Sequence, residues 1–178
     1  MLLPSKKYVE SRFQKLSADN KGSVAIEFAF CALPFLALLF AIIEISMVLL
    51  FSIILDGAVL DAARKIRTGE AFESGDAAGT FATKLCDSLF GVIDCDKVSY
   101  HVTVFPDFSS ITFAPMYDED GEPIPSYFED SVAGDIVVVR ASYTWNILTP
   151  FLAPFLGRDN FGLVATTVFR SEPYQGAI

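Results

Sequence analysis

An apolar stretch at residues 23–55 constrains this chain more than any other feature of its sequence. Its only charged residues are Glu27 and Glu44, and the run at 28–43 carries no charge at all. As a helix, these 33 residues would extend about 50 Å at about 1.5 Å per residue, whereas a bilayer core is about 30 Å thick. The stretch is too long for the apolar region of a cleaved secretory signal, which has about 7–15 residues. We therefore expect a helix that spans a membrane and projects beyond it.

Charge is distributed unevenly around this stretch. Residues 1–22 hold five Lys or Arg and two acidic residues, whereas the whole chain has a net charge of −9 at pH 7. Basic residues flank membrane helices on their cytoplasmic side. We expect a single-pass protein of the inner (cytoplasmic) membrane: a basic cytoplasmic leader at 1–22, a transmembrane helix at 23–55 and a periplasmic domain at 56–178. The acidic body argues against a nucleic-acid partner, because phosphate contacts need clustered cations.

The two acidic residues in the apolar stretch need a reason, because a carboxylate at the centre of a bilayer costs about 2.5–3.5 kcal/mol on insertion scales. Glu27 lies five residues after Gly22, close to the expected membrane surface. Glu44 lies deeper, or near the far surface. Two interpretations of Glu44 stay open: a carboxyl group that is protonated or exposed at the interface, and one that pairs with a partner inside the membrane.

Beyond the membrane the pattern predicts one small domain. Helical character continues to about residue 68, and a second helix is predicted at about 75–90 with Ser74 as its N-cap. Runs rich in β-branched and aromatic residues then predict strands at 98–105, 111–117, 136–145 and 163–170. The predicted fold class is α+β: a long N-terminal transmembrane helix that continues into an exported domain with a second helix and an antiparallel sheet.

Two of the three cysteines, Cys86 and Cys95, fall in the expected exported domain. An oxidising compartment permits a disulfide there, and closing that loop would contribute roughly 2–3 kcal/mol by the chain-entropy estimate. We predict that the two are bonded, with free buried thiols as the alternative. Cys31 lies in the apolar stretch, where it is interpreted as a small packing residue.

Motifs for catalysis and metal binding are absent from the sequence. It has no G-x-S-x-G, H-E-x-x-H, Walker A or G-x-G-x-x-G pattern, no C-x-x-C, and a single histidine, His101. The acidic run at 118–122 does not match the ligand spacing of a calcium loop, and an exposed turn at Asp120 and Gly121 is favoured, with weak Ca²⁺ binding left open. We expect no enzyme activity, no metal site and no cofactor.

A segment at 147–157 is apolar but contains two prolines and is too short to span a membrane. It is interpreted as a loop or helical turn that covers the sheet. The alternative is an exposed apolar surface that contacts another subunit or lies on the membrane.

The junction KGSVAIEF at 21–28 resembles the leader junction of a type IV prepilin, in which a basic leader ends in Gly and Glu is the fifth residue of the apolar segment. The longer run GSVAIEFAFCALPFLALLFAIIEISMVLLF and the following LDGAVLDAARKIRTGE resemble the TadE-like proteins, which are minor pseudopilins of tight-adherence (Tad, Flp) pilus systems. The resemblance covers about residues 20–70, and the C-terminal TTVFRSEPY is similar to the ends of some members.

This resemblance implies roles for the N-terminal residues. A prepilin peptidase would cut between Gly22 and Ser23, and Glu27, with Phe28 beside it, would then face the N-terminal amine of its own or a neighbouring subunit and set the register of assembly. The implied partners are the prepilin peptidase, other Tad pseudopilins and assembly proteins, and the inner membrane. The implied function is structural: a component of a Tad pilus that supports pilus biogenesis and surface adherence, within a pilin-like fold.

Two other functions are weighed against this one. The first is a signal-anchored periplasmic module that binds the envelope or mediates adhesion without entering a pilus, which a retained leader would favour. The second is an anchored enzyme, which the missing catalytic motifs disfavour.

Overall fold

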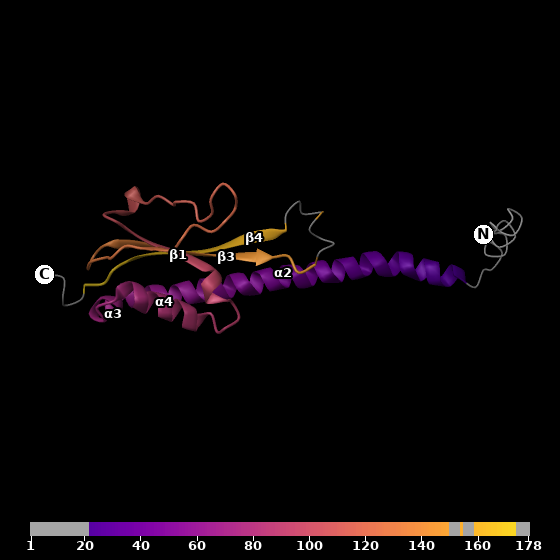
Figure 1. Cartoon of the computed structure of the whole chain (residues 1–178), viewed down its shortest axis with the longest axis horizontal. Helices are drawn as coiled ribbons and strands as arrows, with labels where there is room; N and C mark the ends of the chain where they lie inside the picture. The colour runs from indigo at the N-terminus through magenta and orange to yellow at the C-terminus, as the bar shows by residue number, and fades with distance from the viewer. Residues whose placement is uncertain (1–21, 150–153, 155–158, 174–178) are drawn as a thin grey trace, which may run out of the picture. The chain divides into compact units, whose positions relative to one another are not determined.

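The computed structural model describes residues 22–149, 154 and 159–173 (Figure 1). Nearly all of the leader predicted at 1–22, and most of the apolar segment at 147–157, lie outside the described residues. The chain divides into two compact units, residues 1–43 and 44–178. The fold class is α+β, as predicted, with one long apolar helix, shorter helices and a four-stranded sheet.

The long helix α2 comprises Ser23–Arg67 and enters both units. It ends where the sequence predicts, close to residue 68. Three basic residues in its last turn favour the negative end of the helix dipole. Gly69 follows with φ +81°, a left-handed conformation that glycine adopts without a steric penalty.

Two short helices follow, α3 at Glu70–Glu73 and α4 at Ala77–Ser88. The second helix was predicted, but its N-cap is Asp76 and not Ser74. The Asp76 carboxylate accepts a hydrogen bond from the backbone N–H of Gly79 at 2.9 Å, whereas the Ser74 hydroxyl donates to the carbonyl of Ala71 at 2.7 Å. The Ser74 hydroxyl therefore bonds to the last turn of α3, a helix that the sequence analysis did not predict.

The sheet has the strand order β2-β1-β3-β4. Its strands are β1 (Val98–Phe105), β2 (Tyr127–Phe128), β3 (Ile136–Asn146) and β4 (Asn160–Arg170). The pairs β1·β3 and β3·β4 are antiparallel, in continuous registers that include Val102↔Val139 and Ala141↔Ala165. The short β2 pairs with β1 in parallel, so the sheet is mixed and not wholly antiparallel as predicted.

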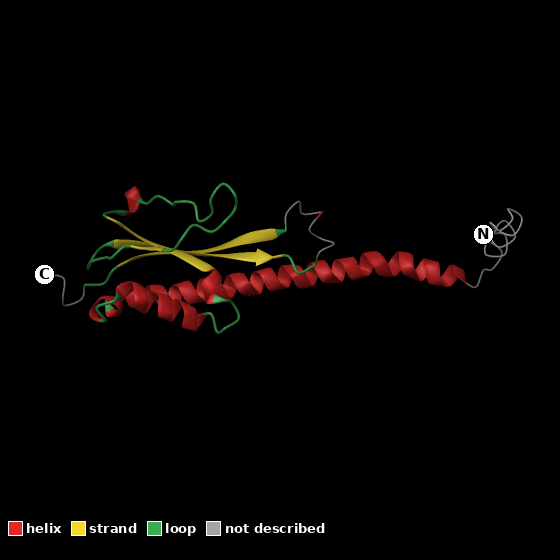
Figure 2. Cartoon of the chain, viewed as in Figure 1, coloured by secondary structure: helices red, strands yellow, loops and turns green. Residues whose placement is uncertain are grey.

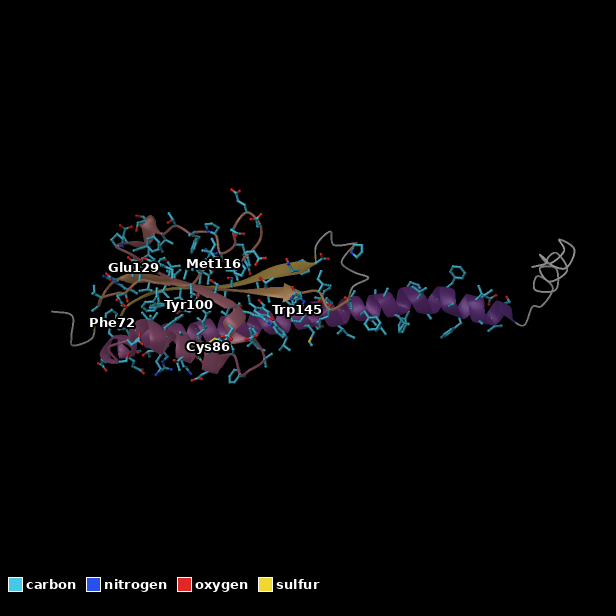
Figure 3. The ribbon with its side chains drawn as sticks, viewed as in Figure 1. Phe72, Cys86, Tyr100, Met116, Glu129 and Trp145 are labelled. Carbon is cyan, nitrogen blue, oxygen red and sulfur yellow. A yellow bond between two sulfur atoms is a disulfide. The ribbon has the colours of Figure 1, made fainter. Side chains whose placement is uncertain are left out.

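The strand predicted at 111–117 is wrong. Most of that segment is irregular, and only Tyr117 forms an isolated bridge, to Pro123. Pro115 removes a backbone donor from the run. The segment lies over the sheet face opposite α2: the Phe113 ring lies 5.5 Å from the Arg140 guanidinium carbon, and Met116 is buried (Figure 3).

The hydrophobic core lies between the sheet and the helices (Figure 2). It joins the buried face of α2, the apolar face of α4 and the side chains of the sheet that point toward them. Phe81 of α4 is fully buried and meets the ring of Tyr100 at 5.1 Å and that of Phe128 at 5.9 Å. The C-terminal part of α2 is thus a core helix, with Leu55 and Ile66 each 1% exposed.

Candidate functional site

The N-terminal acid of α2 contacts the first residue of that helix. The Ser23 hydroxyl donates a hydrogen bond to Oε1 of Glu27 at 3.2 Å, one helical turn away, and both side chains are exposed. Gly22 immediately precedes the helix, and a Cβ there would meet nothing within 4 Å. The carboxylate therefore lies within reach of the residue that a cut after Gly22 would expose.

Outward-pointing apolar side chains surround this acid. Phe28 is 72% exposed and Phe30 is 77% exposed, and exposed large apolar residues continue to Ile43. Among the described residues, α2 is the one helix that is long and apolar enough to cross a membrane. Apolar surface of this extent is stable in a bilayer or against another protein, but not in water.

The second acid, Glu44, is buried in the unit that contains the sheet, at 4% exposure. Its Oε1 accepts a hydrogen bond from Nε1 of Trp145 at 2.8 Å, and its Oε2 accepts one from Oγ1 of Thr149 at 3.0 Å. The backbone N–H of Leu148 donates to both carboxylate oxygens at 3.1 Å. We call these four residues the Glu44 cluster.

The donors of the Glu44 cluster come from the end of β3 and the residues after it. Trp145 also packs edge-on against Phe51 of α2, with ring centroids 4.5 Å apart, and Figure 3 shows it where β3 approaches α2. Every donor is electrically neutral. A carboxylate presents only acceptors, so a set of neighbours that all donate suits the ionised form. The Glu44 cluster thus ties α2 to the end of β3.

The sequence analysis left two interpretations of Glu44 open, an exposed or protonated carboxyl and an intramembrane pair. The structure buries this residue and supplies hydrogen-bond donors from the same chain. The sequence alone did not identify Trp145, Leu148 and Thr149 as the hydrogen-bond partners of Glu44. One signal was available: the only tryptophan of the chain ends a predicted strand, and its indole N–H needs an acceptor when buried.

Cys86 and Cys95, the pair proposed from the sequence, are joined by a disulfide with Cα atoms 5.4 Å apart. Cys86 belongs to the last turn of α4, and Cys95 begins a 3₁₀ turn directly before β1. The bond closes the connection between helix and sheet. Cys31 is a free, exposed thiol in the apolar part of α2.

No group of three or more His, Cys, Asp or Glu residues that could hold a metal ion occurs in the described part of the chain. The acidic run at 118–122 forms the predicted turn, with Gly121 at φ +82°. Oδ1 of Asp118 accepts hydrogen bonds from the backbone N–H groups of Asp120 and Glu122, at 3.0 and 2.8 Å. This carboxylate oxygen is therefore committed to the turn itself.

The last turn of α2 forms a cationic region. Lys65 donates a hydrogen bond to the Glu70 carboxylate, and this bond, assisted by the charge of Arg64, lowers the pKa of Glu70 below its ordinary value. Arg67 pairs with Glu172, which follows β4, at 2.9 Å. Arg64 is exposed.

The comparisons with known proteins agree with the N-terminal pattern. Residues 22–64 match the family model of TadE-like proteins, which confirms the resemblance stated from the sequence. No curated protein and no solved structure matches the chain. The match begins at Gly22 and includes Glu27 and Glu44. It indicates a component related to Tad pili, and the apolar helix fits a membrane-anchored one.

Proposed function

We propose that this chain is a minor pseudopilin of a Tad-type pilus, a membrane-held structural subunit that supports pilus assembly and surface adherence. One observation carries the proposal: the TadE-like segment begins with an apolar helical stretch, residues 23–43, whose large apolar side chains are exposed and whose one acid, Glu27, lies five residues after Gly22. Such a helix needs lipid or other subunits around it, and an acid at a fixed place on it gives those contacts a register.

In this proposal the bilayer holds residues 23–43, a shorter segment than the 23–55 expected from composition. These 21 residues extend about 31 Å, close to the thickness of the bilayer core. From Glu44 onward the helix belongs to the unit of the sheet, where Phe51 and Leu55 pack against the core. The basic leader then lies in the cytoplasm and the sheet in the periplasm.

Cleavage after Gly22 by a prepilin peptidase gives Glu27 its role. The cut leaves an amine on Ser23, and the Glu27 carboxylate already reaches the side chain of that residue at 3.2 Å. In an apolar surrounding, an amine and a carboxylate attract each other strongly, and leaving one of them unpaired costs about 3–5 kcal/mol. Glu27 is then a registration residue for assembly with other pseudopilins and not a catalytic one.

The N-terminus of the protein from native membranes tests the processing step. We expect mass spectrometry and N-terminal sequencing to give a chain that begins at Ser23 in cells with the prepilin peptidase, and an uncut chain in cells without it. An uncut chain in both strains would refute the processing step and favour the alternative, a signal-anchored periplasmic module outside the pilus.

Substitution of Glu27 tests the registration step. In Glu27→Gln we expect cleavage and membrane level to be retained and pilus formation to fall at least tenfold, because the amine loses its charged partner. Glu73→Gln, at the end of α3, is the matched control and should leave pili unchanged. Normal piliation by the Glu27 variant would contradict the proposed register.

A further inference from the structure

Among the described residues, the outer edge of β4 has no partner strand. β4 is the last strand of the order β2-β1-β3-β4, so no described strand pairs with its far side. The hydrogen bond from the N–H of Ile147 to the carbonyl of Asp159 shows which residues of β4 turn their backbone N–H and C=O groups toward β3. Since the facing groups alternate along an antiparallel pair, the backbone groups of residues 162, 164, 166 and 168 point outward.

The outer side of β1, toward the other end of the sheet, is covered by β2 and the residues around it. The backbone N–H of Tyr100 donates to the hydroxyl of Ser126 at 3.2 Å, and that of Val104 donates to the carboxylate of Glu129 at 3.0 Å. The N–H of Glu129 returns a bond to the carbonyl of Val102 at 3.0 Å. Figure 3 labels Tyr100 and Glu129. The described chain thus bonds the outer side of β1 with its own residues, whereas no described strand pairs with the outer side of β4.

β4 also lacks the features that usually prevent pairing at an edge. Natural edge strands carry charges, proline or bulges, which discourage the addition of another strand. Residues 161–169 include no charged residue and no proline, and the register with β3 runs without a bulge over all 11 residues of β4. Val164, on the outward-facing set, is 40% exposed.

A groove of about 540 Å³ runs beside this edge, between β4 and α2. From β4 it is lined by residues 167–169, and from α2 by Leu60, Ala63, Arg64 and Arg67. Leu60 is 58% exposed and adds apolar surface to the groove. A strand paired with β4 would direct alternate side chains toward this groove.

The charge of the groove indicates what such a strand would carry. Two guanidinium groups line it, and the one lining carboxylate, Glu172, is already paired with Arg67. Arg64 makes no salt bridge among the described residues. A local excess of positive charge on a chain of net charge −9 complements an acidic group.

Antiparallel pairing between two copies of β4 is disfavoured by the direction of α2. Glu44 contacts Trp145, beside the first residues of β4, and Arg67 contacts Glu172 just after its end, so α2 and β4 run in the same direction. An antiparallel pair of β4 strands would place the two α2 helices in opposite directions. If α2 is anchored in one membrane, as proposed above, two copies cannot meet in this way.

We propose that the outer edge of β4 and the adjoining groove bind an extended segment of a different protein chain, which adds to the sheet as a further strand and places an acidic side chain beside Arg64. Main-chain hydrogen bonds to β4 supply affinity, whereas the groove and Arg64 supply the choice of partner.

Defined peptides test this site on the full chain in detergent micelles. The probe is a fluorescent peptide of alternating Val and Thr that ends in Asp, compared with the same peptide ending in Lys. By fluorescence anisotropy we expect the Asp peptide to bind at least tenfold more tightly. Two further peptides carry N-methyl groups on one or the other alternate set of amides. Only the set that faces β4 should abolish binding, because the other amides point away from the sheet.

Charge reversal identifies the contact. Arg64→Glu should remove or invert the preference for Asp, whereas Lys97→Glu, an exposed lysine outside the groove, should leave it unchanged. The emission of the single tryptophan checks that each variant is folded. Equal binding of both methylated peptides, or an Asp preference that survives Arg64→Glu, would overturn the proposal. Full competition by the unlabelled chain itself would also overturn it, because the occupant would then be a second copy.

Discussion

Removal of the Glu44 carboxylate should weaken the unit at 44–178 more than any exposed substitution on α2. In Glu44→Ala, the indole N–H of Trp145, the backbone N–H of Leu148 and the hydroxyl of Thr149 all lose their acceptor. A buried donor left without an acceptor costs about 1–3 kcal/mol. Leu148 and Thr149 lie near the surface, where water replaces part of the lost bonding. We therefore expect a total loss of about 3–5 kcal/mol.

Two matched variants separate the hydrogen bonds from the size of the side chain. Glu44→Gln keeps the volume and one acceptor oxygen but turns a donor toward donors, so we expect a loss of about 1–3 kcal/mol. Ile45→Ala changes the neighbouring residue, whose side chain is 61% exposed, and should cost less than about 0.5 kcal/mol. The expected order of stability is wild type, Ile45→Ala, Glu44→Gln and then Glu44→Ala.

The chain provides its own reporter for this measurement. Trp145 is its only tryptophan, and its indole both donates to Glu44 and packs on Phe51. Denaturant unfolding of the full chain in detergent, followed by tryptophan emission, gives the free energy of unfolding and the indole environment together. If Glu44→Ala unfolds with the same midpoint and the same native emission as Ile45→Ala, the Glu44 cluster does not stabilise the fold.

Three further outcomes are expected. Cys86→Ser should lower the free energy of unfolding by about 2–3 kcal/mol relative to the oxidised chain, measured by thermal unfolding, and reduction of the wild type should reproduce it, because the disulfide to Cys95 closes the α4–β1 connection. Gly162→Ala should lower the free energy of unfolding by about 1–3 kcal/mol in the same assay, because the new Cβ would lie 2.6 Å from the Tyr117 ring. An unchanged melting curve would mean that the Tyr117 ring moves aside without cost. Hydrogen bonds to the Asp107 carboxylate, first the one from the Ser109 side chain, lower the pKa of Asp107 in the folded protein. The stability that this group contributes is therefore present above the pKa of Asp107 in the unfolded chain and is lost as the pH falls through its pKa in the folded chain. A carboxyl NMR titration that gives an ordinary pKa for Asp107 would contradict this expectation.

The long helix and three of the strands could be predicted because their patterns are local. Helical character that continues to about residue 68 predicts the end of α2, and the run rich in β-branched and aromatic residues at 98–105 predicts β1. The disulfide pair followed from cysteine spacing and the expected compartment. The TadE-like segment could be recognised because the resemblance depends on residue identities at fixed positions, and a family model matches it over residues 22–64.

The errors arose where partners distant in sequence decide the structure. Residues 111–117 have the composition of a strand, but β3 already has a partner on both sides and β1 pairs with β3 and β2, and the segment instead covers a face of the sheet. Ser74 and Asp76 are equally good N-caps by residue type, and only the formation of α3 decides between them. The donors to Glu44 lie about a hundred residues away, so no local pattern identifies them.

Glu44 lies where the exposed apolar part of α2 ends and the part with a buried face begins. Up to Ile43, exposed apolar residues require lipid or another subunit, whereas from Glu44 onward one face of α2 is buried by the same chain. A carboxylate with its donors already in place is stable at that boundary, but the same group without them would be costly on either side of it. The Glu44 cluster can form only when β3 and the residues after it are in place, so its formation couples folding of the sheet to the point at which α2 leaves the apolar segment.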